Sequence, residues 1–256
     1  MRVSEPQFPP LLEGHAVCAD RTAFAEACRR ARANELGAGA LLWSRSLERA
    51  QLAIVLEPEV ALERGLEMAP LLMVAAGDCL GSLCPPQVGV QYRWPRSILI
   101  NGLPAGEVRI AAPRVPPRAV PAWLVVGVDL ELAPRGERQD WSATSIAEEA
   151  GPGITAAAVL GSLAAHFLSW LHTWQEAGFE PVARQWLFRA EGREESHEPD
   201  GIESTKAHPM RPLDLVEHGD LIVETPQGTR ERRAFIDHLE LVEASADEAV
   251  EDDPLR

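Results

Sequence analysis

The chain has 256 residues, of which 46% are hydrophobic, so it can bury one sizeable core and carry a smaller second module. Most of its net charge of −15 lies at the C-terminal end, where residues 190 to 256 hold 7 basic against 19 acidic residues. A surface that acidic repels phosphate backbones and anionic lipids, which excludes nucleic acids and membranes as expected partners.

Targeting, metal and disulfide signals are missing from the sequence. The N-terminal stretch has no apolar segment of the signal-peptide kind, and no run of about 18 apolar residues occurs, so we expect a cytoplasmic protein. The 4 cysteines and 7 histidines have no metal-ligand spacing, and no disulfide framework is indicated. Lys206 is the one lysine of the chain, so residues 1 to 189 offer no lysine for catalysis.

The predicted elements begin with a Pro-rich, extended lead-in over residues 1 to 13. A helix then runs to Leu36, with Asp20 or Thr22 as its N-cap and Gly37 as its terminator. Its Ala-rich face is suited to close packing on a sheet.

Two strands are predicted next, over 37 to 43 and 51 to 58, and the first is almost wholly apolar. Only seven residues, 44 to 50, join them, which is enough to close a hairpin but not to form a lid. Residues 59 to 83 have helical periodicity, with a kink expected at Pro70.

Residues 92 to 106 read Tyr-Arg-Trp-Pro-Arg-Ser-Ile-Leu-Ile-Asn-Gly-Leu-Pro-Ala-Gly. The pattern predicts a strand, an irregularity marked by Pro95, an apolar strand, and an Asn-Gly turn that leads into a third strand. Another strand is expected over 122 to 132, and a long amphipathic helix over 156 to 177 that ends at Gly178.

Beyond a short helix over 181 to 189, the chain becomes acidic. Residues 190 to 205 have the composition of a linker, and residues 206 to 243 alternate around turns in the manner of a small antiparallel β domain, with strands over 213 to 216, 220 to 225 and 232 to 241. Residues 244 to 256 are expected to be a disordered acidic tail.

The 92 to 106 stretch resembles the signature of biotin and lipoate protein ligases in degenerate form. That signature is Lys-Trp-Pro-Asn-Asp, an apolar strand, a short turn and a Gly-containing strand that forms the pocket floor. Trp94, Pro95 and Gly106 match it, whereas Arg93 replaces the lysine and Arg96-Ser97 replaces Asn-Asp.

Further likenesses follow in the same order along the chain. Residues 125 to 132 resemble the family's Ile-Gly-Ile-Gly-Ile-Asn-Val strand, with Gly127 matching one glycine and Asp129 replacing the other. Residues 143 to 146 resemble its Ala-Thr-Ser-Leu segment, and Trp186 falls where the family has a tryptophan. The collinear series covers about residues 15 to 189.

The resemblance implies an α+β fold of the biotin/lipoate ligase type, similar to class II synthetases. It consists of a mixed sheet with packed helices in residues 1 to 189, followed by an SH3-like β module in residues 206 to 243. The family's long Gly-Arg-rich lid loop corresponds to the seven-residue connection.

The resemblance also implies a pocket around seven candidate ligand-binding residues: Arg45, Arg93, Trp94, Pro95, Gly106, Gly127 and Asp129. Arg93 is expected to grip a carboxylate or phosphate in place of the family's lysine, and its alternative role is a structural ion pair at a sheet end. Asp129 and Glu131 face one side of a strand, where they could hold Mg²⁺ or a ligand amine, although a solvated strand face is the favoured reading.

The joint loss of lid loop, lysine and strand glycine predicts a catalytically divergent protein that binds a small carboxylate or acyl ligand without adenylating it. The alternative is an active biotin, lipoyl or octanoyl ligase or transferase that acts on a protein lysine and uses Arg93 and Arg45 as its cations. A third interpretation is an interaction protein whose pocket is closed by Asp129 and bulky neighbours. ATP, Mg²⁺ and biotin or lipoate are cofactors or substrates only of the active alternative; an acyl-carrier protein and a second copy of the chain are further partners that the resemblance allows.

Overall fold

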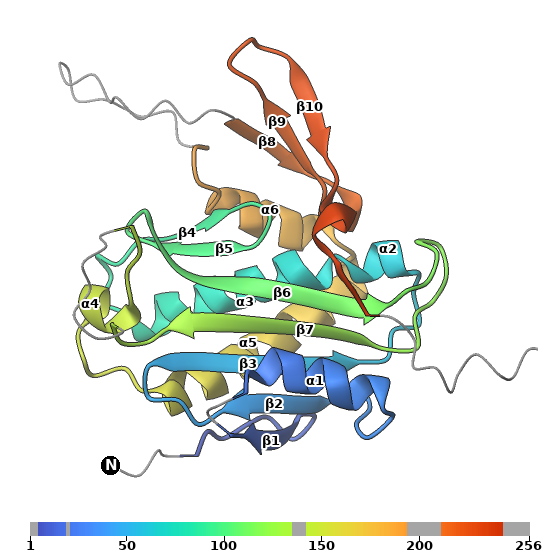
Figure 1. Cartoon of the computed structure of the whole chain (residues 1–256). Coiled ribbons are helices and arrows are strands. Elements are labelled where there is room, and N and C mark those ends of the chain that lie inside the picture. The colour runs from blue at the N-terminus through green and yellow to red at the C-terminus, as the bar shows by residue number, and fades with distance from the viewer. Residues whose placement is uncertain (1–4, 19–20, 135–141, 194–210, 243–256) are drawn as a thin grey trace, which may run out of the picture.

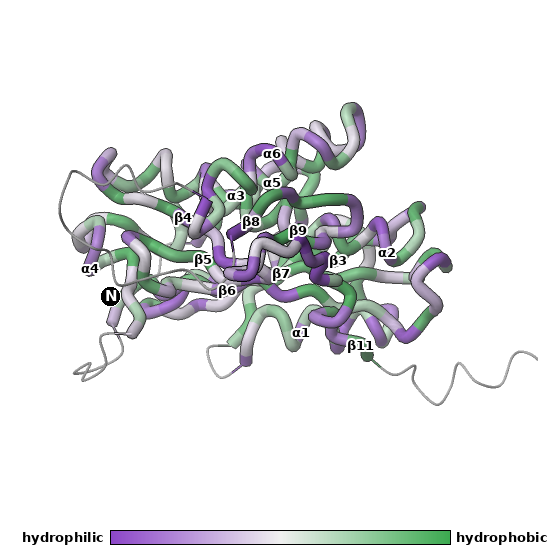
Figure 2. Tube along the Cα trace, turned by 90° about the horizontal axis from the view of Figure 1, so that it is seen from above, coloured by the Kyte–Doolittle hydropathy of each residue, from purple (hydrophilic) through white to green (hydrophobic). Residues whose placement is uncertain are grey.

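The computed structural model describes residues 5–18, 21–134, 142–193 and 211–242. The central feature is a mixed sheet in the order β1-β2-β3-β7-β6-β5-β4 (Figure 1). Its strands are Glu13–Val17, Ala40–Ser44, Arg49–Leu56, Leu124–Glu131, Leu103–Pro113, Ser97–Ile100 and Val90–Arg93, in that order. Seen from above, α1 (Ala23–Arg32) lies on one side of the sheet, and α3 (Met68–Leu83), α5 (Ala156–Ala177) and α6 (Glu180–Phe188) lie on the other (Figure 2).

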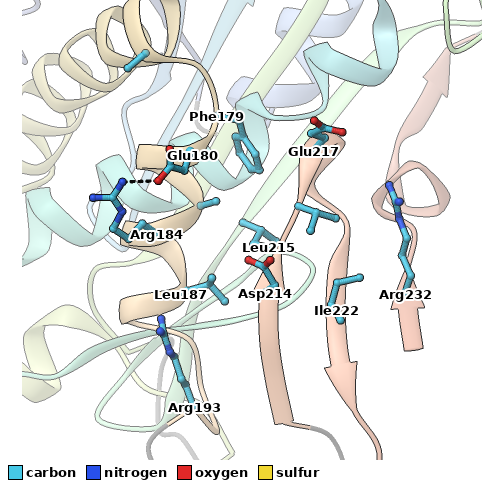
Figure 3. A pocket seen from close by; sticks show the side chains of 13 residues that line it. Phe179, Glu180, Arg184, Leu187, Arg193, Asp214, Leu215, Glu217, Ile222 and Arg232 are labelled. Atoms are coloured by element: carbon cyan, nitrogen blue, oxygen red, sulfur yellow. Dashed lines mark hydrogen bonds and ion pairs between the residues drawn. The ribbon is translucent and has the colours of Figure 1, made fainter. Parts of the chain in front are cut away.

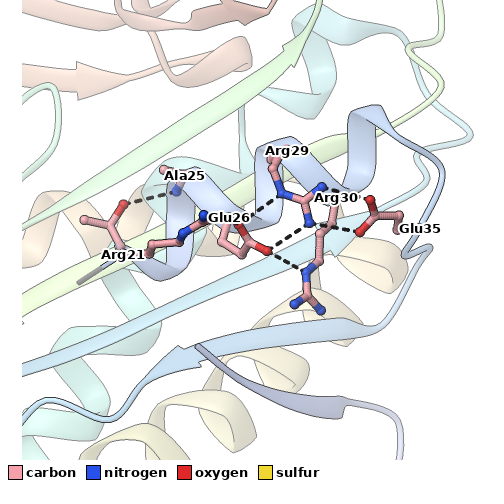
Figure 4. A network of polar contacts seen from close by, with 7 residues as sticks. Arg21, Ala25, Glu26, Arg29, Arg30 and Glu35 are labelled. Carbon is pink, nitrogen blue, oxygen red and sulfur yellow. Dashed lines mark hydrogen bonds and ion pairs between the residues drawn. The ribbon is translucent and has the colours of Figure 1, made fainter. Parts of the chain in front are cut away.

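Helix α1 covers its face of the sheet with small side chains and one aromatic ring. Ala23, Phe24, Ala27 and Ala31 are buried against inward-facing residues of β2, β3, β6 and β7. The helix begins at Thr22, whose hydroxyl accepts the N–H of Ala25, as the sequence predicts. Glu26 of this helix is also buried and accepts hydrogen bonds from three arginines, a network drawn in Figure 4.

The opposite face carries the main hydrophobic core. Helix α3 packs against the sheet and against α5, and 12 of its 16 residues are buried. Residues Leu62–Leu83 are apolar and long enough to cross a membrane by composition, but 78% of their most apolar window is buried inside the fold, as in a core helix.

The single kinked helix expected over residues 59 to 83 is wrong in detail. The segment divides into α2 (Leu62–Gly65) and α3, and the break lies at Leu66 and Glu67 rather than at Pro70. Pro70 falls in the first turn of α3, where its missing N–H has no intrahelical partner to lose. Glu67 turns its carboxylate away from the helix and toward Trp174.

The predicted hairpins are confirmed. β2 and β3 pair antiparallel, and β4, β5 and β6 form a meander in which Asn101 (φ 50°) and Gly102 (φ 81°) make the turn. Strand β1, which begins at the last residue of the expected lead-in, is missing from the sequence prediction. It pairs parallel with β2 at the edge of the sheet.

A small antiparallel module follows α6, as the sequence predicts, and consists of β8 (Arg211–Leu215), β9 (Leu221–Glu224) and β10 (Arg230–Arg233). The third predicted strand, 232 to 241, is wrong, because it divides into β10, the 3₁₀ turn η2 (Phe235–His238) and β11 (Glu240–Val242). β11 returns to the main sheet and pairs parallel with the end of β6 (Figure 1). Most of the linker and all of the acidic tail expected from the sequence lie outside the described residues.

Candidate functional site

The seven candidate residues do not form one cluster. Arg93, Trp94 and Pro95 lie at the turn between β4 and β5, at one edge of the main sheet. Arg45 follows β2, near the opposite edge. Gly106, Gly127 and Asp129 lie on the adjacent central strands β6 and β7, so the structure brings together only these three.

Arg93 is bound to a residue of its own chain. Its Nε and one terminal nitrogen donate to the two carboxylate oxygens of Glu191, at 2.5 and 2.7 Å. The Arg93 side chain is 47% exposed, and it extends the contact between β4 and the segment after α6. This is the arrangement of a structural ion pair at a sheet end.

Trp94 contacts the C-terminal module. Its indole N–H donates to the carbonyl of Gly219 at 3.1 Å, and its ring lies edge-on to Phe235 and His238, with centroids 6.3 and 4.9 Å away. Buried Glu67 provides a second link, because its carboxylate accepts the indole N–H of Trp174 and the backbone N–H of His218. Burial raises the pKa of Glu67, although these hydrogen bonds oppose the change.

Arg45 pairs with exposed Glu5 at 2.6 Å and lies over the ring of Trp43. Both charged side chains are more than half exposed, so the contact resembles an ordinary surface ion pair. A different arginine, Arg49 at the start of β3, pairs with Asp129 in the centre of the sheet.

Gly127 and Asp129 line a small hollow that we call the α1-face crevice. It lies between the start of α1 and strands β3, β6 and β7, and its volume is about 20 Å³. Its lining residues are Thr22, Phe24, Gln51, Arg109, Gly127, Val128 and Asp129. A hollow of that size holds about one water molecule.

Two glycines allow the chain to pack closely here. A Cβ at Gly127 would lie 2.8 Å from the ring of Phe24, and one at Gly106 would lie 2.5 Å from the carbonyl oxygen of Asp129. The space left by the missing side chains is therefore occupied by groups of this chain: the Phe24 ring packs over Gly127, and the Asp129 backbone packs against Gly106.

Asp129 is the centre of a polar cluster on the floor of the crevice. Arg49 Nε donates to one of its carboxylate oxygens at 2.6 Å, and a terminal nitrogen of Arg49 lies 2.6 Å from the other, to which the Gln51 amide donates at 2.7 Å. Burial raises the pKa of Asp129, and the hydrogen bonds from Arg49 and Gln51 oppose that rise. Glu131 faces the same side, with an oxygen 3.5 Å from Arg49, so the two carboxylates share a cation instead of forming a solvated strand face.

Arg109 closes the other side of the crevice and is absent from the sequence-predicted site. Its guanidinium makes two 2.7 Å hydrogen bonds to the carboxylate of Glu240 in β11, and lies 4.4 Å from the centroid of Phe24. Arg109 and Gly127 are cross-strand partners in β6 and β7, which explains how the two meet. The sequence does contain a signal for Arg109, because a charged residue at an inward-facing position of an apolar strand is uncommon.

The arginines at and beside the crevice are already paired with carboxylates. Arg109, which lines it, binds Glu240, and Arg49, which binds the lining residue Asp129, also contacts Glu131. A triphosphate brings several negative charges, and this part of the described chain has no excess positive charge to receive them. Among the described residues, His, Cys, Asp and Glu form no group of three that could hold a metal ion.

Three larger cavities lie elsewhere. One, of about 790 Å³, lies between α6 and the C-terminal module, where Leu187, Leu215 and Ile222 are flanked by acidic and basic side chains (Figure 3). Another, of about 490 Å³, is lined by α2, α3 and α5 and includes Trp174. Neither of these two contains a candidate residue from the sequence, whereas the third, of about 400 Å³, is lined by Arg45 together with Glu5 and Trp43.

Comparison with known proteins gives a consistent result. A family model described as the Biotin/lipoate A/B protein ligase family matches residues 8–188. A curated biotin–[acetyl-CoA-carboxylase] ligase of Paracoccus denitrificans is 27% identical over 187 residues, which are 72% of this chain and 74% of that protein.

Solved structures extend the likeness. A biotin protein ligase-like protein of unknown function from Silicibacter sp. TM1040 has a TM-score of 0.78 and 30% identity, and the match covers 91% of this chain and 99% of that one. Biotin protein ligase from Aquifex aeolicus has a TM-score of 0.64 at 12% identity, covers 91% and 96% of the two chains, and is similar in fold alone. The ligase-type fold expected from the resemblance is confirmed.

Proposed function

Because the chain belongs to the Biotin/lipoate A/B protein ligase family, we propose that it is a divergent member that binds a small carboxylate or acyl ligand at the α1-face crevice without converting it to an adenylate. The observation that carries this proposal is the bond between Arg49 and Asp129. Arg49 is the first residue of β3, directly after the connection that corresponds to the family's lid loop, and Asp129 replaces a strand glycine. Two departures from the family pattern therefore meet in one contact.

The chemistry of the crevice favours a carboxylate. The Arg109 guanidinium and Gly127 line the crevice, Arg49 binds the lining residue Asp129, and the ring of Phe24 offers an apolar surface beside Arg109. Both guanidiniums already bind internal carboxylates, which shows the kind of group that they accept. A ligand that brings a single carboxylate can exchange for one of these.

The same arrangement disfavours adenylation. Formation of an acyl adenylate places the acid and the α-phosphate of ATP side by side, and the reaction needs cations that stabilise the pentavalent phosphorus as pyrophosphate leaves. The arginines of the crevice are neutralised by carboxylates, and the one lysine of the chain is Lys206, outside residues 1 to 189.

The test uses the full chain with biotin, lipoate or octanoate and Mg-ATP. Pyrophosphate release and acyl-AMP, measured by mass spectrometry, should both be absent, while thermal-shift titration with short and medium acids should raise the melting temperature in a concentration-dependent way. Arg49→Gln, which leaves Asp129 without its cation, should weaken that stabilisation, and Arg93→Gln, which removes an ion pair at the sheet edge, should leave it unchanged. Adenylate formation, or the lack of stabilisation by any acid, would refute the proposal.

A second candidate is an active ligase that adds an acyl group to a protein lysine. It is favoured by the 27% identity with the curated ligase of Paracoccus denitrificans. In that case pyrophosphate and acyl-AMP should appear, and substitution of the arginines that replace the family's cations should remove both. Arg93→Gln and Arg45→Gln are the corresponding variants.

A further inference from the structure

The link between Arg109 and Glu240 joins the C-terminal end of the described chain to the crevice. Arg109 lies on β6 with its guanidinium over Phe24, and Glu240 is the first residue of β11. The two side chains are 131 positions apart in sequence, and they meet because β11 pairs with β6 at Ala111, two residues beyond Arg109. The C-terminal strand therefore supplies the group that neutralises the crevice arginine.

β11 is held to the main sheet by few contacts. It has three residues, pairs with β6 at three positions, and Leu241 in its middle is 42% exposed. The side chains of Arg109 and Glu240 are 32% and 35% exposed, so solvent and small solutes reach the ion pair. An ion pair of that exposure contributes little to stability and exchanges readily with a competing carboxylate.

We propose that Arg109 is the carboxylate-binding residue of the crevice and that Glu240 is an internal competitor, so that β11 holds the site closed until a ligand carboxylate replaces it. This inference rests on the proposed function, because it concerns the same ligand and the same crevice. Glu240 binds Arg109 through two parallel hydrogen bonds, which is the geometry that a free monocarboxylate adopts on a guanidinium. The small volume of the crevice then belongs to the closed form of the protein.

The consequence for affinity follows from a two-state equilibrium. If only a fraction of the chains has Arg109 released, the apparent dissociation constant for an acid is raised by the inverse of that fraction. Removal of the Glu240 charge should release Arg109 in most molecules. A closed form favoured roughly tenfold would then give a roughly tenfold gain in affinity.

The experiment compares the natural chain with Glu240→Gln and with the matched control Glu231→Gln, using octanoate as the probe. Glu231 is also an exposed acidic residue of the C-terminal region in an ion pair, with Arg233, but it lies on β10, away from the crevice. Isothermal titration should show octanoate binding about tenfold tighter to E240Q and unchanged for E231Q. In the double variant Arg109→Gln with Glu240→Gln, binding should be lost.

The outcomes separate this inference from the proposed function. Equal affinity of the natural chain and E240Q, or binding retained in the double variant, would overturn the competitor role while leaving the proposed function in place. Absence of octanoate binding in every variant would overturn both. A second measurement needs no variant: excess octanoate should accelerate hydrogen exchange of the amides of residues 240 to 242 in the natural chain, and unchanged exchange on saturation would refute displacement of β11, even if E240Q failed to fold.

Discussion

Glu26 on α1 provides a quantitative test of how the helix is held on the sheet. Its side chain is almost buried, and its carboxylate accepts hydrogen bonds from Arg21 at 3.0 Å, from Arg29 at 2.9 and 3.1 Å, and from Arg30 at 2.8 Å (Figure 4). The hydrogen bonds from Arg29 and then Arg30 lower the pKa of Glu26 from 4.5 to about 2, and burial opposes them. The substitution Glu26→Gln keeps the shape of the side chain but leaves three guanidiniums without the charge that holds them together.

The expected loss of stability near pH 7 can be estimated from that pKa. A pKa lowered by this amount corresponds to roughly 3 kcal/mol of folding free energy before solvent screening is taken into account. Because the three arginines are 29 to 60% exposed and solvent screens them, about 1 to 2 kcal/mol is expected for E26Q. Since the pKa is lowered in the folded state, this contribution is fully present above about pH 4.5 and is lost as the pH falls through about 2.

The assay is urea unfolding followed by circular dichroism, with the natural chain and E26Q compared at several pH values. The difference in free energy of unfolding should be constant near neutral pH and should shrink steadily on acidification below about pH 4.5. Glu180→Gln is the control, because Glu180 forms an exposed i,i+4 pair with Arg184 on α6 and should change stability by less than about 0.5 kcal/mol. A difference for E26Q that is no larger than the control, or that persists unchanged into acid, would refute the reasoning.

Three further outcomes are expected. Trp94→Phe should cost about 1 kcal/mol in urea unfolding, because it removes the indole donor to the η1 carbonyl (η1, Glu217–Gly219), and limited proteolysis should then cleave the C-terminal module faster. Gly77→Ala should lower the melting temperature clearly, since its methyl group would lie 1.9 Å from the Tyr92 hydroxyl. Gly81→Ala is the control and should have little effect, because its methyl group would lie 3.6 Å from the nearest neighbour. Similar melting temperatures of the two variants would contradict the packing argument. Burial raises the pKa of the Cys28 thiol to about 12, so iodoacetamide at about pH 8 should modify it slowly in the folded protein and rapidly in denaturant, as mass spectrometry of peptides would show.

Local signals predicted the elements whose ends are set by the backbone itself. Helix α5 begins at Thr155, whose hydroxyl accepts the N–H of Ala158, and it ends at Gly178, where φ is 74°. The Asn101–Gly102 turn was predicted for the same reason, because both residues tolerate positive φ. These positions depend on neighbours within a few residues, so one sequence suffices to find them.

Elements that depend on distant partners were missed. β1 is a strand because it pairs with β2, and β11 is one because it pairs with β6, more than 120 positions earlier in the chain. α3 begins directly after Glu67, whose carboxylate is bound by groups from α5 and η1. None of these partners leaves a periodic signal in the segment itself.

The candidate site divides in the same way. The glycine and aspartate of β7 were found because they occupy fixed positions in a recognisable strand pattern. Arg49 and Arg109 were not found, because each bonds its carboxylate across 80 and 131 positions respectively. A sequence motif identifies where a pocket lies, whereas the charged side chains beside it are determined by contacts between residues that are far apart in the sequence.

Trp94, which matches the tryptophan of the family signature, connects the 92 to 106 stretch to the crevice through the C-terminal module. It holds the η1 carbonyl and packs on Phe235 and His238, and the chain reaches Glu240 two residues after His238. The docking of the module at Trp94 therefore fixes the start of β11, which in turn sets the position of the Glu240 carboxylate on Arg109. A change that loosens this docking should release Arg109 without touching the crevice, so Trp94→Phe should raise the affinity for octanoate in the same direction as E240Q and by a smaller factor.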